Sequence, residues 1–131
     1  MKVLLVSADP KVREMMELCV RSVQRSLPGE PLEFIQAKDG VAGIKAAWRH
    51  RPQVVVADEI TSRAGAFALA KDLKGAVPAH PARVVILLDR PQDQWLASWS
   101  GADAWFVKPV NPFDLAERVG ELLAPPREEA V

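Results

Sequence analysis

Charged and polar side chains directly follow the short apolar runs of this chain, and they are the residues best placed to do chemistry. In chain order they are Ser7 and Asp9, with Ala8 between them, then Asp58, Asp89 and Lys108. Ligands of open parallel sheets gather outside the carboxyl ends of the strands. If the runs are strands of one sheet, an aspartate and a lysine at neighbouring strand ends can approach closely and attract each other.

Other kinds of reactive site are poorly supported. Cys19 is the single cysteine, so it cannot form an internal disulfide, and no Cys/His spacing suits zinc. His50 and His80 lie beside prolines, are expected in loops, and belong to no nucleophile–base arrangement. Gly-rich phosphate loops, G-x-S-x-G elbows and H-E-x-x-H runs do not occur. The sequence therefore gives no reason to expect an enzyme.

Five apolar runs alternate with amphipathic segments. The expected strands are residues 2–7, 32–37, 54–57, 84–88 and 105–107. The expected helices run from Pro10 to Leu27 before Pro28-Gly29, from Asp39-Gly40 to before Pro52, from about Gly65 to Lys74, across Trp95 to Trp99, and across Phe113 to Leu123. This alternation predicts a doubly wound α/β fold, a five-stranded parallel sheet with helices on both faces.

The composition narrows the class of protein. The 131 residues are 49% hydrophobic and 26% charged, with 17 basic and 17 acidic side chains, which fits one globular domain. The chain lacks the basic excess of a nucleic-acid-binding module and any apolar run long enough to span a membrane. We expect a cytoplasmic domain over residues 1–124, followed by a tail or the start of a linker over 125–131.

Three features together resemble the receiver domain of bacterial response regulators. They are Asp58 after the third apolar run, the stretch from Gly101 to Pro109 (GADAWFVKP), and the amphipathic last helix. The resemblance covers roughly residues 2–124. It implies a flavodoxin-like (CheY-like) sheet with strand order 2-1-3-4-5. It also implies a phosphorelay role, in which a histidine kinase phosphorylates an aspartate and Mg²⁺ assists.

The resemblance assigns roles to three residues of this chain. Asp58 matches the aspartate that accepts the phosphoryl group, and Lys108 matches the lysine that contacts it. Trp105 matches the aromatic position that moves inward as the signal spreads. The Lys108-Pro109 peptide bond is expected to be cis, a geometry largely confined to proline.

Other site positions depart from the family pattern. The acidic pair that binds Mg²⁺ in receivers falls on Ser7 and Ala8. The hydroxyl residue after the fourth strand falls on Leu88 or its immediate neighbour, and no hydroxyl occurs between Val84 and Gln94. Asp9 is expected to cap the first helix, which leaves only a weak metal site formed by Asp9 and Asp58. Mg²⁺ needs carboxylates that hold it against its hydration shell. We therefore expect at most weak binding of Mg²⁺ and predict no other cofactor.

These departures predict an atypical receiver that acts mainly through protein–protein contact, with impaired Mg²⁺-dependent phosphorylation of Asp58. The alternative is a conventional phospho-accepting receiver, and a more remote one is a small-ligand-binding flavodoxin-like domain or enzyme. The expected partner is a histidine kinase or another signalling protein, with neither nucleic acid nor membrane involved. A homodimer could form through the fourth helix, the fifth strand and the fifth helix.

Three apolar or aromatic residues are expected to serve packing and not chemistry. Cys19 is predicted to be a buried thiol, because it lies on the apolar face of the first helix. Trp95 and Trp99 are four residues apart and share one helix face. We expect them to cover the core. The alternative is an exposed aromatic anchor, because Trp is enriched in binding hot spots.

Overall fold

A computed structural model describes residues 1–27, 31–59 and 65–124. Within these ranges the strands are β1 (Lys2–Val6), β2 (Glu33–Ala37), β3 (Val54–Asp58), β4 (Arg83–Leu88) and β5 (Ala104–Val107). The α-helices are α1 (Pro10–Arg21), α2 (Gly40–His50), α3 (Ala66–Gly75), α4 (Gln94–Trp99) and α5 (Pro112–Leu123). Two short 3₁₀ turns, η1 (Gln24–Ser26) and η2 (Pro91–Asp93), precede β2 and α4.

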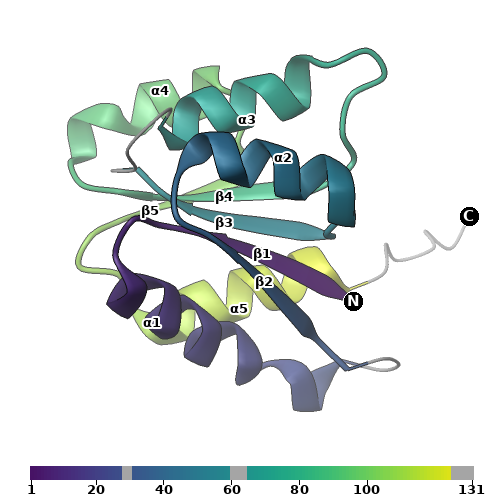
Figure 1. The fold of residues 1–131 in the computed structure, drawn as a ribbon. Coiled ribbons are helices and arrows are strands. Elements are labelled where there is room, and N and C mark those ends of the chain that lie inside the picture. Colours follow the sequence, from purple (N-terminus) through teal and green to yellow (C-terminus); the bar gives the residue numbers. More distant parts are fainter. Residues whose placement is uncertain (28–30, 60–64, 125–131) are drawn as a thin grey trace, which may run out of the picture.

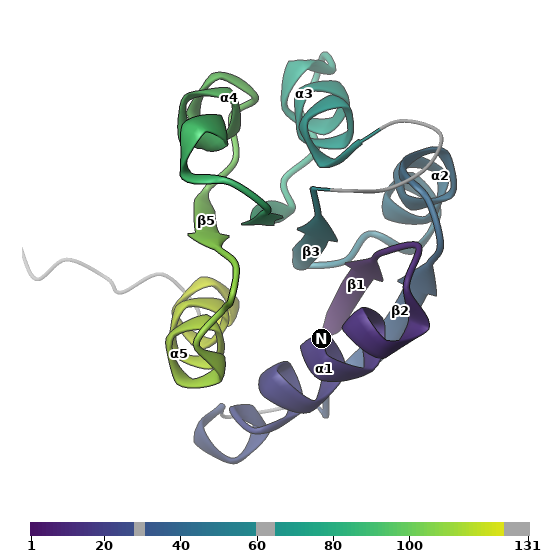
Figure 2. The same cartoon turned by 90° about the vertical axis from the view of Figure 1, so that its left-hand side faces the viewer.

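The strands form one parallel sheet in the order β2-β1-β3-β4-β5, as expected. Helices α1 and α5 cover one face, and α2, α3 and α4 cover the other (Figure 1; Figure 2 shows the two layers end-on). Alternate residues of each strand feed the two layers. In β1, Leu4 and Val6 pack toward α2 and α3, whereas Val3 and Leu5 pack toward α1 and α5. No helix in the described ranges is long and apolar enough to cross a bilayer.

Side-chain caps fix where three of the helices begin. Asp9 accepts a hydrogen bond from Lys11 N at the start of α1, so the predicted cap is confirmed. Asp39 accepts from Ala42 N at the start of α2, and Asn111 caps α5 in the same way. These caps matter for the site because the strand ends and the helix starts share the same loops.

The predicted end of the first helix was wrong. The sequence pattern extended that helix to Leu27, but α1 ends at Arg21 with Ser22 as its C-cap. The hydroxyl group of Ser22 donates a hydrogen bond to the carbonyl oxygen of Cys19 at 2.6 Å, a local bond that competes with further helix. Leu27 still packs against the core on the α1 side. The predicted stop at Pro28-Gly29 lies outside the described residues.

The prediction that both histidines lie in loops is confirmed for His80 and wrong for His50. His50 is the last residue of α2 and not part of a loop. His80 does lie in the loop before β4, where it is 2% exposed and packs edge-on against Trp48. Its Nδ1 accepts a hydrogen bond from Ala82 N at 3.0 Å, so its Nε2 donates to the carbonyl oxygen of Ala47 at 2.8 Å.

A charged cluster holds the amino end of β5. The carboxylate of Asp103 accepts a hydrogen bond from Val84 N at 2.7 Å and pairs with Lys74 at 2.8 Å. Lys74 also donates to the carbonyl oxygen of Ala82 at 2.9 Å. Gly101 precedes this cluster with a φ of 88°, a conformation that favours glycine. The start of the edge strand is therefore tied to α3 and β4.

Candidate functional site

The predicted site lies at the carboxyl ends of the central strands. Asp58 is the last residue of β3 and is 4% exposed, and Lys108 directly follows β5. The Nζ of Lys108 donates a hydrogen bond to Oδ1 of Asp58. The structure thus brings together the two side chains that the family resemblance paired.

Ser7 forms a hydrogen bond with the second carboxylate oxygen of Asp58. Its buried hydroxyl group donates to Oδ2 of Asp58 at 2.9 Å and accepts from the backbone N–H of Asp9 at 3.1 Å. Both carboxylate oxygens of Asp58 therefore have a donor within the chain. A serine in place of an acidic residue turns a repulsive neighbour of Asp58 into a hydrogen-bond donor.

Lys108 is shared between two carboxylates. Its Nζ also donates to Oδ1 of Asp89 at 2.7 Å, so Asp89 points into the site. Burial lowers the pKa of Lys108, but hydrogen bonds to Asp58 and Asp89 and the attraction of their charges outweigh it, and the net pKa is raised. The lysine is firmly held in its charged form.

A second acidic group beside the site was missed by the sequence reasoning. The carboxyl groups of Glu59 and Asp93 share a hydrogen bond, and Glu59 also accepts from the backbone N–H of Asp89. Burial, followed by the hydrogen bond to Asp93, raises the pKa of Glu59. The bond from Glu59 and two bonds from Arg90 lower the pKa of Asp93. The only sequence signals for this group were one acid directly after the third strand, Glu59, and one directly before the fourth helix, Asp93.

The donor set does not fit the Mg²⁺ ion that the family implies. Ala8 has no ligand atom, and the hydroxyl group of Ser7 and the ammonium group of Lys108 already bind Asp58. The carboxylate of Asp9 is turned to its helix cap. Among the described residues, no group of three or more His, Cys, Asp or Glu side chains is arranged to hold a metal ion. Octahedral coordination by oxygen would require these contacts to break.

The two remaining predicted positions lie at the end of β4 and on β5. Leu88 is fully buried in the layer formed with α2, α3 and α4, so an aliphatic group stands where receivers have a hydroxyl. Trp105 packs partly buried against the same layer, and its Nε1 donates to Oε1 of Gln94 at 3.4 Å. The Lys108-Pro109 peptide bond is cis, as predicted.

The expectation that Trp95 and Trp99 cover the core was wrong. They are 66% and 57% exposed, and Ala97 between them is the buried residue of α4. The ammonium group of Lys71 lies 4.4 Å from the ring centroid of Trp99. The predicted burial of Cys19 is confirmed, with 8% of that residue exposed.

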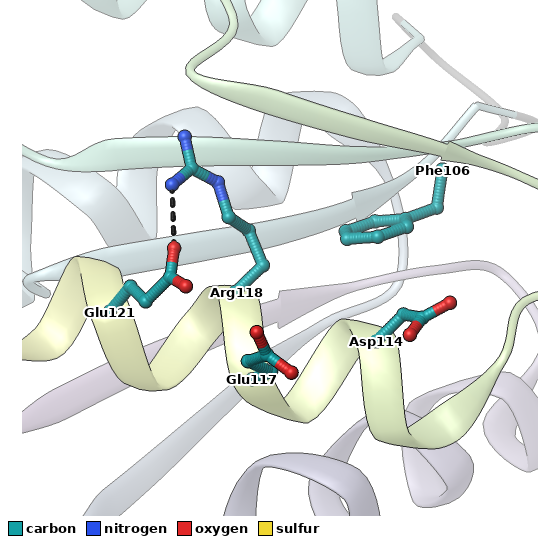
Figure 3. A pocket seen from close by; sticks show the side chains of 5 residues that line it. All are labelled: Phe106, Asp114, Glu117, Arg118 and Glu121. Atoms are coloured by element: carbon teal, nitrogen blue, oxygen red, sulfur yellow. Dashed lines mark hydrogen bonds and ion pairs between the residues drawn. The ribbon is translucent and has the colours of Figure 1, made fainter.

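Two pockets lie between β5 and α5, away from Asp58. One of about 210 Å³ is lined by Phe106, Asp114, Glu117, Arg118 and Glu121. Figure 3 shows Arg118 rising from α5 beside the ring of Phe106 and paired with Glu121. The other, about 320 Å³, is lined by Asp103, Ala104, Trp105, Phe106 and Arg118. Neither pocket includes a residue that contacts Asp58.

The curated proteins that are similar in sequence to this chain are response regulators. No protein-family model matches the chain. The chain is 30% identical over 127 residues to an uncharacterised response regulatory protein of Mycobacterium tuberculosis, which covers 96% of this chain and 93% of that protein. It is 28% identical over 123 residues to the response regulator MprA of Mycobacterium leprae. That match covers 94% of this chain and 51% of MprA.

Solved structures show the same fold. The signal receiver domain of a histidine kinase from Syntrophus aciditrophicus superposes with a TM-score of 0.81 at 21% identity, covering 99% of this chain and 96% of that one. The chemotaxis response regulator CheY4 of Vibrio cholerae gives a TM-score of 0.76 at 23% identity, covering 93% and 98%. Sequence, strand order and fold agree, and the chain belongs to the response regulators as a receiver domain of two-component signalling.

Proposed function

We propose that this receiver signals mainly through protein–protein contact and that Mg²⁺-dependent phosphorylation of Asp58 is impaired. The observation that carries the proposal is that Ser7 and Lys108 together satisfy both oxygens of Asp58. An attacking carboxylate must lose at least one of these bonds. The phosphoryl group would then arrive where no acidic pair holds the metal that neutralises its oxygens.

Electrostatics favour the same conclusion. Asp58, Asp89 and Lys108 together leave one net negative charge, whereas the three carboxylates and one lysine of a regular receiver leave two, so the attraction for a divalent cation is weaker here. Leu88 supplies methyl groups where a hydroxyl would bond to a phosphoryl oxygen. In this proposal Asp58 and Lys108 remain from the family's phosphorylation site, and Trp105 keeps the switch position without being driven by phosphate.

The partner belongs to the same proposal. Receiver domains interact with histidine kinases and other proteins, and we assign this chain such a partner in the cytoplasm, with neither nucleic acid nor membrane bound directly. The elements offered are α4, β5 and α5, of which α4 carries the exposed Trp95 and Trp99 and α5 carries the exposed Phe113. A homodimer through this surface is one form that the contact can take. No catalytic role is assigned to the domain.

The alternative is a conventional receiver that accepts a phosphoryl group at Asp58, with Asp9 and Asp58 as its weak metal ligands. Titration with Mg²⁺ and then beryllofluoride, a phosphoryl mimic, separates the two. Tryptophan fluorescence is followed in a Trp95→Phe/Trp99→Phe background, so that Trp105 contributes more of the emission. Both replaced residues are exposed, and the fold does not depend on them.

The expected result is no saturable change at millimolar Mg²⁺, either in this protein or in its Asp58→Ala variant. A saturable change that Asp58→Ala abolishes would establish the conventional receiver. The remote alternative, a small-ligand-binding domain or enzyme, has no observation in its favour. A cellular test uses Asp58→Asn, which should leave partner binding almost unchanged. Loss of signalling with an intact fold would contradict the proposal.

A further inference from the structure

The contact between Lys108 and Asp89 has no counterpart among the roles assigned above. Asp89 lies one residue beyond β4, and its Oδ1 is 2.7 Å from the Nζ of Lys108. The two side chains are 27% and 31% exposed, so this contact faces the opening of the site, whereas Asp58, with a side chain 6% exposed, lies beneath it. An anion that approaches Asp58 from solvent meets Asp89 first.

The position of Asp89 is fixed by backbone contacts on both sides. Its N–H donates to the carboxylate of Glu59, and the N–H of Glu59 is bonded to the carbonyl oxygen of Leu87 at 2.8 Å. The N–H of Lys108 donates to the carbonyl oxygen of Leu88, also at 2.8 Å. The backbones of both partners are thus anchored to the end of β4, which keeps the two side chains within reach of each other.

We propose that Asp89 is a built-in competing anion, which occupies Lys108 at the place where an incoming phosphoryl oxygen would bind. Asp89 is then a specificity-determining residue of the pocket, because it selects against external oxyanions. This inference rests on the proposed function, since it supplies one cause of the impaired phosphorylation. Glu59 acts as a positioning residue for Asp89.

The charges around Lys108 show why the competition is effective. Asp58 and Asp89 carry two negative charges against one positive charge, so the pocket presents a net negative charge to an anion. Neutralising Asp89 brings the local charge to zero, and removing its acceptor oxygen as well frees one N–H donor of Lys108. Unlike charges at this spacing near a surface interact strongly enough to change anion affinity by at least about tenfold.

The test compares this protein with Asp89→Asn, which removes the charge, and Asp89→Ala, which also removes the acceptor. Beryllofluoride with Mg²⁺ is the probe, followed by calorimetry. The pKa of Lys108 is measured in parallel by NMR of its ε-carbon. Asp72→Asn is the matched control, because Asp72 is an exposed aspartate of α3 with no assigned contact.

We expect both Asp89 variants to lower the pKa of Lys108 and to bind the mimic at least about tenfold more tightly than the parent protein or Asp72→Asn. An unchanged pKa of Lys108, or equal affinity in all four proteins, would overturn the inference. Tight binding by the parent protein would contradict the proposed function. The inference would survive that result if the Asp89 variants bound more tightly still.

Discussion

The carboxyl end of the sheet and the outer surface of α4, β5 and α5 lie on the same small domain but have opposite character. At the sheet end, Asp58 is almost fully buried and its polar atoms have partners within the chain. On the outer surface, Trp95, Trp99 and Phe113 are each more than half exposed. In the first region the carboxylate of Asp58 is hydrogen-bonded within the chain, and in the second region large apolar side chains are exposed to solvent.

This difference indicates which region contributes to the stability of the fold and which can contribute to the free energy of binding a partner. Charges that are paired inside the domain stabilise the fold and respond weakly to outside ions. Exposed aromatic rings contribute little to the fold and can contribute strongly to binding. In a receiver that switches by phosphorylation, we would expect the sheet end to be the responsive region. Under the proposed function, the outer surface is instead the part that acts.

The largest expected effect comes from removing the lysine. Lys108→Ala leaves the carboxylates of Asp58 and Asp89 without their cation, and we expect the free energy of unfolding to fall by about 2 kcal/mol, because the group is partly exposed. Urea unfolding near neutral pH measures it. Lys45→Ala, on the exposed side of α2, is the control and should change stability by less than about 0.5 kcal/mol. Equal losses would mean that the sheet end is no better satisfied than ordinary surface.

An intermediate effect separates the tryptophans of the two regions. Trp105→Ala removes a partly buried ring from the layer with α3 and α4, and we expect a loss of about 1.5 kcal/mol, below the cost for a fully buried ring. Trp95→Ala and Trp99→Ala should each cost less than about 0.5 kcal/mol in thermal or urea unfolding. They should, however, weaken binding of a partner protein in a pull-down. A large loss of stability in either would show that the outer surface serves the core.

The smallest expected effect lies at Glu59. Its folded-state pKa is raised, so the native state holds this proton more tightly than the unfolded state. Native stability therefore falls as the pH rises from the ordinary carboxyl pKa through the raised value. Glu59→Gln does not titrate, yet it can accept from the N–H of Asp89 and donate to Asp93. We expect this variant to gain a few tenths of a kcal/mol over the parent protein above that window.

Urea unfolding at about pH 4 and about pH 7 detects the change, because the advantage of Glu59→Gln should be present only at the higher pH. Glu33→Gln, at an exposed position of β2, is the control and should show no such pH dependence. If Glu59→Gln were more stable than the parent protein by the same amount at both pH values, the titration of Glu59 beside Asp93 would not be the cause of the gain.

Much of the fold was predictable from the sequence because each buried strand is a continuous apolar run, as in Val54–Ala57, with an N-cap or a glycine before the next helix. Strand ends alone predicted that an aspartate and a lysine could meet, and the family resemblance singled out Asp58 and Lys108 as the pair. The bond from Ser7 to Asp58 did not, because a hydroxyl's direction depends on the tertiary fold. The contact between Glu59 and Asp93 depends on the path of the loop before α4. Trp95 and Trp99 shared a helix face, but periodicity did not tell which way that face points.

The two charged clusters on β5 have a mechanical consequence. Asp103 ties one end of this edge strand to Val84 and Lys74, and Lys108 ties the other end to Asp58 and Asp89. A strand held at one end can swing, whereas one held at both behaves like a clamped beam and resists sliding and rolling. The switch position proposed for Trp105 would then have to work by rotation of its ring and not by displacement of the strand.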